Sequence, residues 1–152
     1  MTWTKLAHIR VPGIPRPQGK LITRSVRGRG IGHMPVHVER HRQKVAWAAK
    51  RAWDHPVRFD GPIWLEAVFS FTRPQSQMGT GRNKGIPKPW APTHHIQTPD
   101  VDKLCRLVLD ALEQAHVIRN DSQVTILEGR KQWHTEPETH LTVWGWDTDA
   151  DC

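Results

Sequence analysis

The alternation of apolar and polar residues along the chain predicts four β-strands. Residues 6–11 form a short apolar run that ends at a Pro-Gly pair, and residues 62–71 give the strongest strand signal because they are rich in aromatic and β-branched side chains. Two more strands are predicted at 123–133 and 140–146. In the last strand, two sets of side chains alternate and therefore lie on opposite faces: Leu141, Val143 and Gly145 on one, and Thr142, Trp144 and Trp146 on the other.

Helical periodicity predicts two α-helices between these strands. The first covers residues 36–53 and ends at an Asp-His-Pro turn. The second, at 99–115, has the clearer pattern, and a proline with two aspartates at its start suits the positive end of the helix dipole. The apolar sides are Val38, Val45, Ala48, Ala49 and Ala52 in the first helix, and Val101, Leu104, Cys105, Val108, Leu109, Ala111, Leu112 and Ala115 in the second.

Two irregular segments lie between these elements. Residues 16–36 combine arginine and glycine without a hydrophobic period, which indicates a basic loop or a short hairpin, and residues 73–98 indicate a long excursion rich in proline and basic residues. The order strand, helix, strand, helix, strand, strand predicts one α+β domain over residues 1–146, with a mixed β-sheet and two main helices. The acidic residues 147–152 are expected to form a frayed tail.

Composition narrows the class of protein. The chain has 152 residues, of which 37% are hydrophobic and 24% charged, which is typical of one globular domain and excludes collagen-like or wholly disordered chains. No apolar run approaches ~20 residues, so no membrane partner is expected, and the N-terminus lacks the apolar core of a signal peptide. Cys105 and Cys152 cannot form a disulfide framework. These features predict a cytoplasmic protein.

Charge is distributed unevenly along the chain. The net charge is +7, to which residues 1–58 contribute +11, residues 59–98 contribute +2 and residues 99–152 contribute −6. Lysine and arginine side chains replace counterions on phosphates and so give affinity for nucleic acid, which makes DNA the favoured partner. The alternative interpretation is that the positive charge only keeps the protein soluble. The candidate DNA-binding residues lie in the two irregular segments: Arg16, Lys20, Arg24, Arg27, Arg29, Arg82, Lys84 and Lys88.

Three aspartates are candidates for a metal site. Asp100 and Asp102 straddle the start of the second predicted helix, and Asp121 follows that helix after a short turn. Clustered carboxylates repel one another, and bound Mg²⁺ removes this cost and can activate water for phosphodiester hydrolysis. The helix separates Asp121 from Asp100, so the two can meet only through a return strand or through a paired subunit. Aspartates at a helix start are also common as partners of the dipole, which is the alternative interpretation.

Three sequence blocks surround these aspartates: Pro-Asp-Val-Asp-Lys-Leu at 99–104, Leu-Asp-Ala-Leu at 109–112 and Ile-Arg-Asn-Asp-Ser-Gln-Val at 118–124. In order and spacing they resemble the RusA family of Holliday-junction resolvases, whose pattern reads Pro-Asp-x-Asp-Asn-Leu, Leu/Phe-Asp-Ala-Leu and Asp-Asp-x-Gln-Val. The resemblance implies a homodimeric α+β endonuclease that uses Mg²⁺, with Mn²⁺ as a possible substitute, to cut four-way junctions in DNA recombination and repair. It places the catalytic metal ligands at Asp100, Asp102 and Asp121.

Two positions depart from the family pattern. Asn120 replaces the first aspartate of the Asp-Asp turn, and Arg106 replaces a helix lysine, which makes Arg106 a candidate for holding the scissile phosphate. Supporting roles are expected for Lys103, Asp110 and Asn120, and an ordinary helix ion pair between Arg106 and an aspartate is the alternative. These departures leave open a protein of the same fold that binds branched DNA without cutting it, and a nuclease acting on forks or flaps is a third possibility.

The histidines carry weaker signals. His33, His37 and His41 are spaced by four, but Pro35 interrupts the helix and no acidic or cysteine partner accompanies them, so a zinc site is not expected. The pair His94-His95 is interpreted as surface histidine, with phosphate contact or proton donation as the alternative.

The eight tryptophans are unusual in a chain without tyrosine. Trp90 stands in the second basic segment, where it could stack on an unpaired base. Core or dimer-interface positions are expected for Trp47, Trp64, Trp133 and Trp144, and a core position for Cys105.

Overall fold

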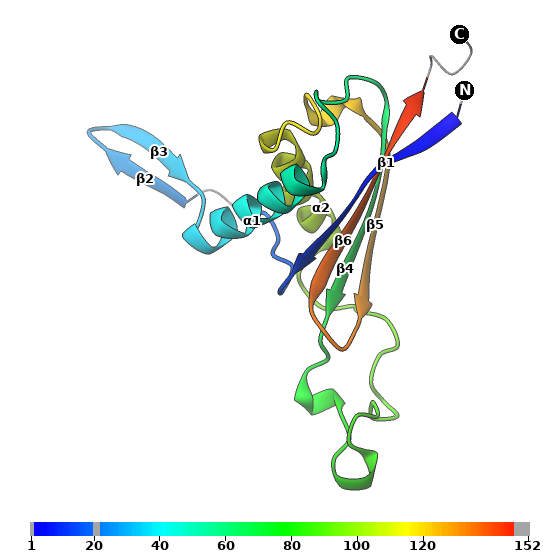
Figure 1. Ribbon diagram of the computed structural model, residues 1–152. Coiled ribbons are helices and arrows are strands. Elements are labelled where there is room, and N and C mark those ends of the chain that lie inside the picture. The colour runs from blue at the N-terminus through cyan, green and yellow to red at the C-terminus, as the bar shows by residue number, and fades with distance from the viewer. Residues whose placement is uncertain (1, 20–21, 148–152) are drawn as a thin grey trace.

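A computed structural model describes residues 2–19 and 22–147 of the chain. Its centre is a four-stranded sheet in the order β1-β6-β4-β5, with both long helices on one face (Figure 1). β4 pairs parallel with β5 and antiparallel with β6, and β6 pairs antiparallel with β1, so the sheet is mixed. The predicted α+β class is confirmed. The elements of this layer are β1 (Thr2–Pro12), α1 (Val36–Ala52), β4 (Ile63–Phe71), α2 (Val101–Gln114), β5 (Val124–Trp133) and β6 (Glu138–Asp147).

The hydrophobic core lies between the helices and the inner face of the sheet. β4 buries every second side chain from Ile63 to Phe69, and Leu141 and Val143 of β6 lie beside them, as the predicted alternation requires. α2 turns six residues toward this face: Leu104, Cys105, Leu107, Val108, Ala111 and Leu112. Each fully buried Val, Leu, Ile or Phe contributes about 1.5–3 kcal/mol, so this layer fixes the position of α2 on the sheet.

Two projections extend from this layer in different directions (Figure 1). The first is a hairpin of β2 (Ile22–Val26) and β3 (Arg29–His33), within the segment expected to be a loop or a hairpin. Its two-residue turn has positive φ at Arg27 and Gly28, which matches the twist of the flanking strands. The second, residues 72–98, is here called the extension and includes the short 3₁₀ turns η1 (Gln75–Gln77) and η2 (Gly81–Asn83).

The extension has a defined internal structure. The Arg73 guanidinium donates to Gln77 Oε1 at 3.1 Å and to the Pro92 carbonyl at 2.8 Å. The backbone N–H of Lys88 donates to the Gln77 carbonyl at 2.8 Å. These bonds tie both arms of the extension together close to the sheet and leave its tip, with Arg82, exposed.

Several boundaries and burials differ from expectation. β1 begins at Thr2 because it pairs along almost all of β6, which runs to Asp147; residues 148–152, the rest of the expected tail, lie outside the described residues. Trp47 is 63% exposed on α1, so it is not in the core, and a position at a dimer interface stays a prediction. His95, expected at the surface, is buried with its ring centroid 4.4 Å from those of both Phe71 and Trp133, and this burial lowers its pKa.

The other tryptophans divide between the two faces. Trp133 is half-buried and packs against the core, whereas Trp64 and Trp144 stack at 5.4 Å on the face of the sheet opposite the helices. Cys105 is buried as expected, and burial raises the pKa of its thiol to about 11. Within the described residues, no helix is both long and apolar enough to cross a membrane.

Candidate active site

Asp100 and Asp102 lie at the start of α2. The helix begins at Val101, two residues later than predicted, and Asp100 is its N-cap residue. The Asp100 carboxylate accepts a hydrogen bond from Lys103 Nζ at 3.0 Å, and both side chains are about half exposed. This hydrogen bond and the charge of Asp100 raise the pKa of the Lys103 ammonium. Asp102 is also exposed, so both carboxylates are open to a ligand from solvent.

The backbone in front of these aspartates is anchored by Lys131, a residue that the sequence did not single out. Its ammonium, near the end of β5, donates to the carbonyls of Gln97 at 2.6 Å and Pro99 at 3.0 Å. The backbone N–H of Gln18 also donates to the Lys103 carbonyl at 3.1 Å. Two elements distant in sequence therefore hold the start of α2 in place.

Asp121 lies on a different anchored turn. It begins the 3₁₀ turn η3 (Asp121–Gln123), which Asn120 caps by accepting from the Ser122 backbone N–H at 3.0 Å. The buried Gln123 donates to the carbonyls of Phe59 at 2.9 Å and Gly61 at 3.0 Å, next to the start of β4. Asn120 thus has a structural role in this turn, and Asp121 itself is exposed.

These two anchored groups lie at opposite ends of α2. The helix has 14 residues and spans about 21 Å at ~1.5 Å per residue. The return strand β5 starts beside Asp121 and brings Lys131, rather than Asp121, back to the helix start. Among the described residues, no three His, Cys, Asp or Glu side chains gather as a possible metal site. Within one chain, therefore, the return strand does not unite the three aspartates.

A comparison with known families identifies the family of the chain. The sequence pattern of the family described as endodeoxyribonuclease RusA matches residues 12–144. The chain belongs to the RusA family. The match extends from the end of β1 to residue 144 within β6, and so includes both anchored aspartate segments. RusA proteins are endodeoxyribonucleases, which supports a nuclease activity for this chain. A search of curated proteins found no match.

Arg106, the departure from the RusA helix lysine, lies one turn beyond Asp102 and is exposed. It pairs with neither Asp102 nor Asp110 in the part of the chain that the structure describes, so the expected alternative of a helix ion pair is not found. Asp110 instead faces a hollow near the other end of α2 that also contains Arg42 and Arg119. The Arg106 guanidinium is therefore available to an anion near Asp102.

The candidate DNA-binding residues lie on the two projections and the segment before them. Arg16 precedes the hairpin, and Lys20 lies outside the described residues. Trp90 is 64% exposed, with the Lys88 ammonium 5.8 Å from its ring centre. Of the expected DNA-binding residues, the following are exposed: Arg16, Arg24, Arg27, Arg29, Arg82 and Lys84.

Proposed function

We propose that this RusA protein is a Mg²⁺-dependent endonuclease that resolves Holliday junctions as a symmetric dimer, cutting phosphodiester bonds during DNA recombination and repair. The observation that carries this proposal is the exposed pair Asp100–Asp102 at the start of α2, flanked by Lys103 and Arg106. Two carboxylates beside two cations suit a site that must hold both a metal ion and a phosphate.

The donor chemistry fits a hard divalent cation. Asp100 and Asp102 offer exposed carboxylate oxygens, the ligand type that Mg²⁺ prefers, and Mn²⁺ accepts the same donors. When bound, the ion would activate water and stabilise the leaving oxygen. Lys103 donates a hydrogen bond to Asp100, and in this proposal Arg106 neutralises the phosphate on which charge develops. With only two carboxylates from one chain, the ligand set calls for a third.

A second copy of the chain can supply the third carboxylate. An apolar hollow of about 260 Å³ lies between the first half of α2 and the middle of β5, and Asp102 and Arg106 complete its lining. β5 is an edge strand of the sheet, and Leu127 on it is 45% exposed. Exposed apolar side chains on an unpaired edge favour association with another chain. The apolar lining of the hollow consists of Val101, Cys105, Leu109, Leu127 and Gly129.

The position of this hollow determines what a dimer would do. A two-fold axis through the middle of β5 exchanges the two ends of α2, because it runs the two copies in opposite directions. It therefore brings Asp121 of the second copy toward Asp100 and Asp102 of the first. By the same symmetry, Asp121 of the first copy comes toward Asp100 and Asp102 of the second. The dimer then has two equivalent sites about 20 Å apart, one for each of two opposed strands. Each site is complete only in the dimer.

Junction cleavage tests the activity. A labelled synthetic four-way junction is incubated with the protein, with and without Mg²⁺, beside linear duplex, fork and flap substrates of the same sequence. We expect Mg²⁺-dependent nicks in two opposed strands of the junction and little cutting of the duplex. Faster cutting of forks or flaps would reassign the substrate. Binding without cutting, both with and without Mg²⁺, would favour the alternative of a protein that binds branched DNA without cutting it. The departures from the family pattern at Asn120 and Arg106 leave this alternative open.

Mixed dimers test the shared site. The variants Asp102→Asn and Asp121→Asn are each expected to be inactive, while junction binding is kept because no basic contact is removed. Co-expressed with different tags and purified as the mixed dimer, they leave one site with Asp100, Asp102 and Asp121 all intact, and cleavage of one strand returns. The matched control combines Asp100→Asn with Asp102→Asn, which damages both sites and stays inactive. An inactive mixed dimer in the first pairing would refute the shared site.

A further inference from the structure

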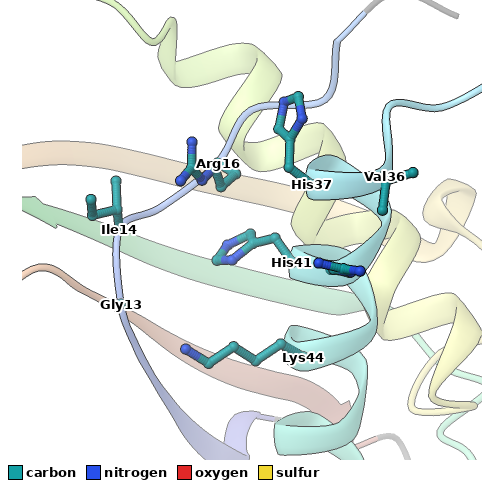
Figure 2. Close-up of a pocket in the computed structure, with 8 residues that line it drawn as sticks. Gly13, Ile14, Arg16, Val36, His37, His41 and Lys44 are labelled. Carbon is teal, nitrogen blue, oxygen red and sulfur yellow. The ribbon is translucent and has the colours of Figure 1, made fainter.

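A basic hollow lies between α1 and the segment that follows β1. It has a volume of about 570 Å³, and His41 and Lys44 extend from α1 toward the segment that carries Gly13 and Arg16 (Figure 2). No acidic residue is among those that line it: Gly13, Ile14, Arg16, Val36, His37, Arg40, His41 and Lys44.

The basic side chains of α1 converge because of their spacing. His37, Arg40, His41 and Lys44 stand at i, i+3, i+4 and i+7, so they share one face of the helix. Lys44 is fixed against the opposite wall, since its ammonium donates to the Pro12 carbonyl. Gly13 permits this approach: its φ is +104°, and a Cβ there would lie 2.9 Å from Lys44 Nζ. One side of the hollow is therefore fixed by a specific contact between α1 and the end of β1.

The hollow continues toward the carboxylates of the candidate active site. Ile14 and Arg16 also line a second hollow of about 470 Å³, whose far side contains Asp100 and Lys103. In the other direction, Lys44 also lines a third hollow of about 490 Å³ beside Arg51. We call these three hollows together the α1 groove. Within the described residues, Asp100 is the one acidic side chain that lines it.

Some cations of the chain are neutralised by acidic neighbours: Arg10 and Lys103, which line the groove, pair with Glu138 and Asp100. Arg42 lies 3.6 Å from Glu39, and Arg58 lies 3.2 Å from Asp60. Arg16 and Arg40 are exposed and form no ion pair in the described part of the chain. An unneutralised cationic groove concentrates field and attracts anions. Arg16 and Arg40 can therefore bind an anion without first breaking an ion pair.

We propose that the α1 groove binds consecutive phosphates of one DNA strand and leads that strand to Asp100 and Asp102. From His37 to Lys44 the helix rises about 10 Å, so this face is long enough to reach more than one phosphate of the same strand. His41 acts as a hydrogen-bonding ring rather than a cation, because burial, with Lys44 and Arg16 nearby, lowers its pKa to about 4. The choice of DNA as the ligand rests on the proposed function.

The test compares two double variants that each remove two positive charges. Arg16→Gln/Arg40→Gln removes the two unpaired arginines of the groove, whereas Lys5→Gln/Lys50→Gln removes two exposed lysines that line none of its three hollows. Binding of a fluorescent junction is measured in EDTA, so that no strand is cut, over a series of salt concentrations. Each lost phosphate contact lowers the slope of log affinity against log salt by about 0.9, so the groove variant should lose about 1.8 and the control almost nothing.

An unchanged slope in the groove variant would overturn the proposal, as would an equal fall in both variants, which would indicate a general effect of net charge. Isothermal titration with inorganic phosphate at constant ionic strength forms the second arm. Saturable phosphate binding that the groove variant loses while its junction binding stays normal would assign the hollow to a free anion. Melting curves check that both variants fold. Because binding is read without cleavage, a protein that fails to cut junctions can still pass or fail this test.

Discussion

Gln123 offers a direct measure of how the Asp121 turn is held. Its side chain is 7% exposed and fills all four of its main hydrogen-bonding positions. Nε2 donates to the carbonyls of Phe59 and Gly61, and Oε1 accepts from the backbone N–H groups of Arg119 at 2.5 Å and Asn120 at 3.3 Å. One side chain thus joins the turn to the start of β4.

Replacement by methionine keeps the volume and removes all four bonds. A typical hydrogen bond contributes about 1 kcal/mol net, and a buried group left without a partner costs more, so Gln123→Met should lower the free energy of unfolding by about 3–4 kcal/mol. For a domain of this length that corresponds to a fall in Tm of about 10 °C. The matched control is Gln132→Met, which loses one hydrogen bond, from Nε2 to Ser70 Oγ at 3.1 Å, and should cost about 1 kcal/mol.

Urea unfolding followed by tryptophan fluorescence measures both variants, and the chain contains eight tryptophans to report it. The reasoning fails if Gln123→Met costs no more than Gln132→Met. Junction cleavage supplies a second readout: under conditions where Gln123→Met is still folded, we expect cleavage to fall and junction binding to persist, because the variant releases Asp121 and leaves every cation in place.

Four further predictions concern single positions. Gly129→Ala should cost about 1–3 kcal/mol in urea unfolding, because its Cβ would lie 2.6 Å from Cys105 Sγ, and adding Cys105→Ala should recover most of the loss. Asn120→Asp should leave Tm unchanged, since Asp caps as well as Asn, and should lower the Mg²⁺ concentration needed for half-maximal cleavage by adding charge beside Asp121. In single-turnover cleavage, Arg106→Ala should lose a factor of roughly 10²–10³ while Arg106→Lys keeps much of the rate; a normal rate for the alanine variant would contradict the phosphate role. Because the pKa of His41 is lowered in the folded protein, the unfolded chain is protonated at this residue before the folded protein as the pH falls. His41 therefore favours folding above pH ~6.5, and that contribution is lost as the pH falls toward 4. Unfolding curves of His41→Gln should show a weaker loss of stability over that range.

The sequence predicts most of the fold because its strongest signals are local. The helical period at 101–114 and the alternation at 141–146 each depend on which side chains can face one core, and both are found where expected. His95 shows the limit of such signals. Its neighbours are polar and proline-rich, and only packing between Phe71 and Trp133, from two separate strands, buries it.

Long-range pairing explains the other differences. Residues 2–5 carry no apolar period, yet they form the start of β1 because β6 pairs with them from more than 130 positions away. The same holds for the aspartates. The motif predicts that Asp121 acts with Asp100, but the register of β5 on β4, with Val124 opposite Ile63, places Asp121 at the far end of the helix. Tertiary structure, not spacing in the sequence, therefore sets the separation of the aspartates within one chain.

The proposed mechanism explains why positive and negative charge are concentrated in different parts of the chain. Carboxylates that hold a metal also repel the phosphate they must cut, so cations have to bring the DNA backbone to them. The net +11 of residues 1–58 includes Arg16 and the cations of α1 that form the α1 groove, whereas the net −6 of residues 99–152 includes all three aspartates. Asn120 in place of an aspartate then reduces the repulsion at each site by one charge, and it also weakens the attraction for a metal ion. The expected gain in Mg²⁺ affinity for Asn120→Asp should therefore be accompanied by weaker junction binding in EDTA, and a variant that gained both would show that the two charges do not compete.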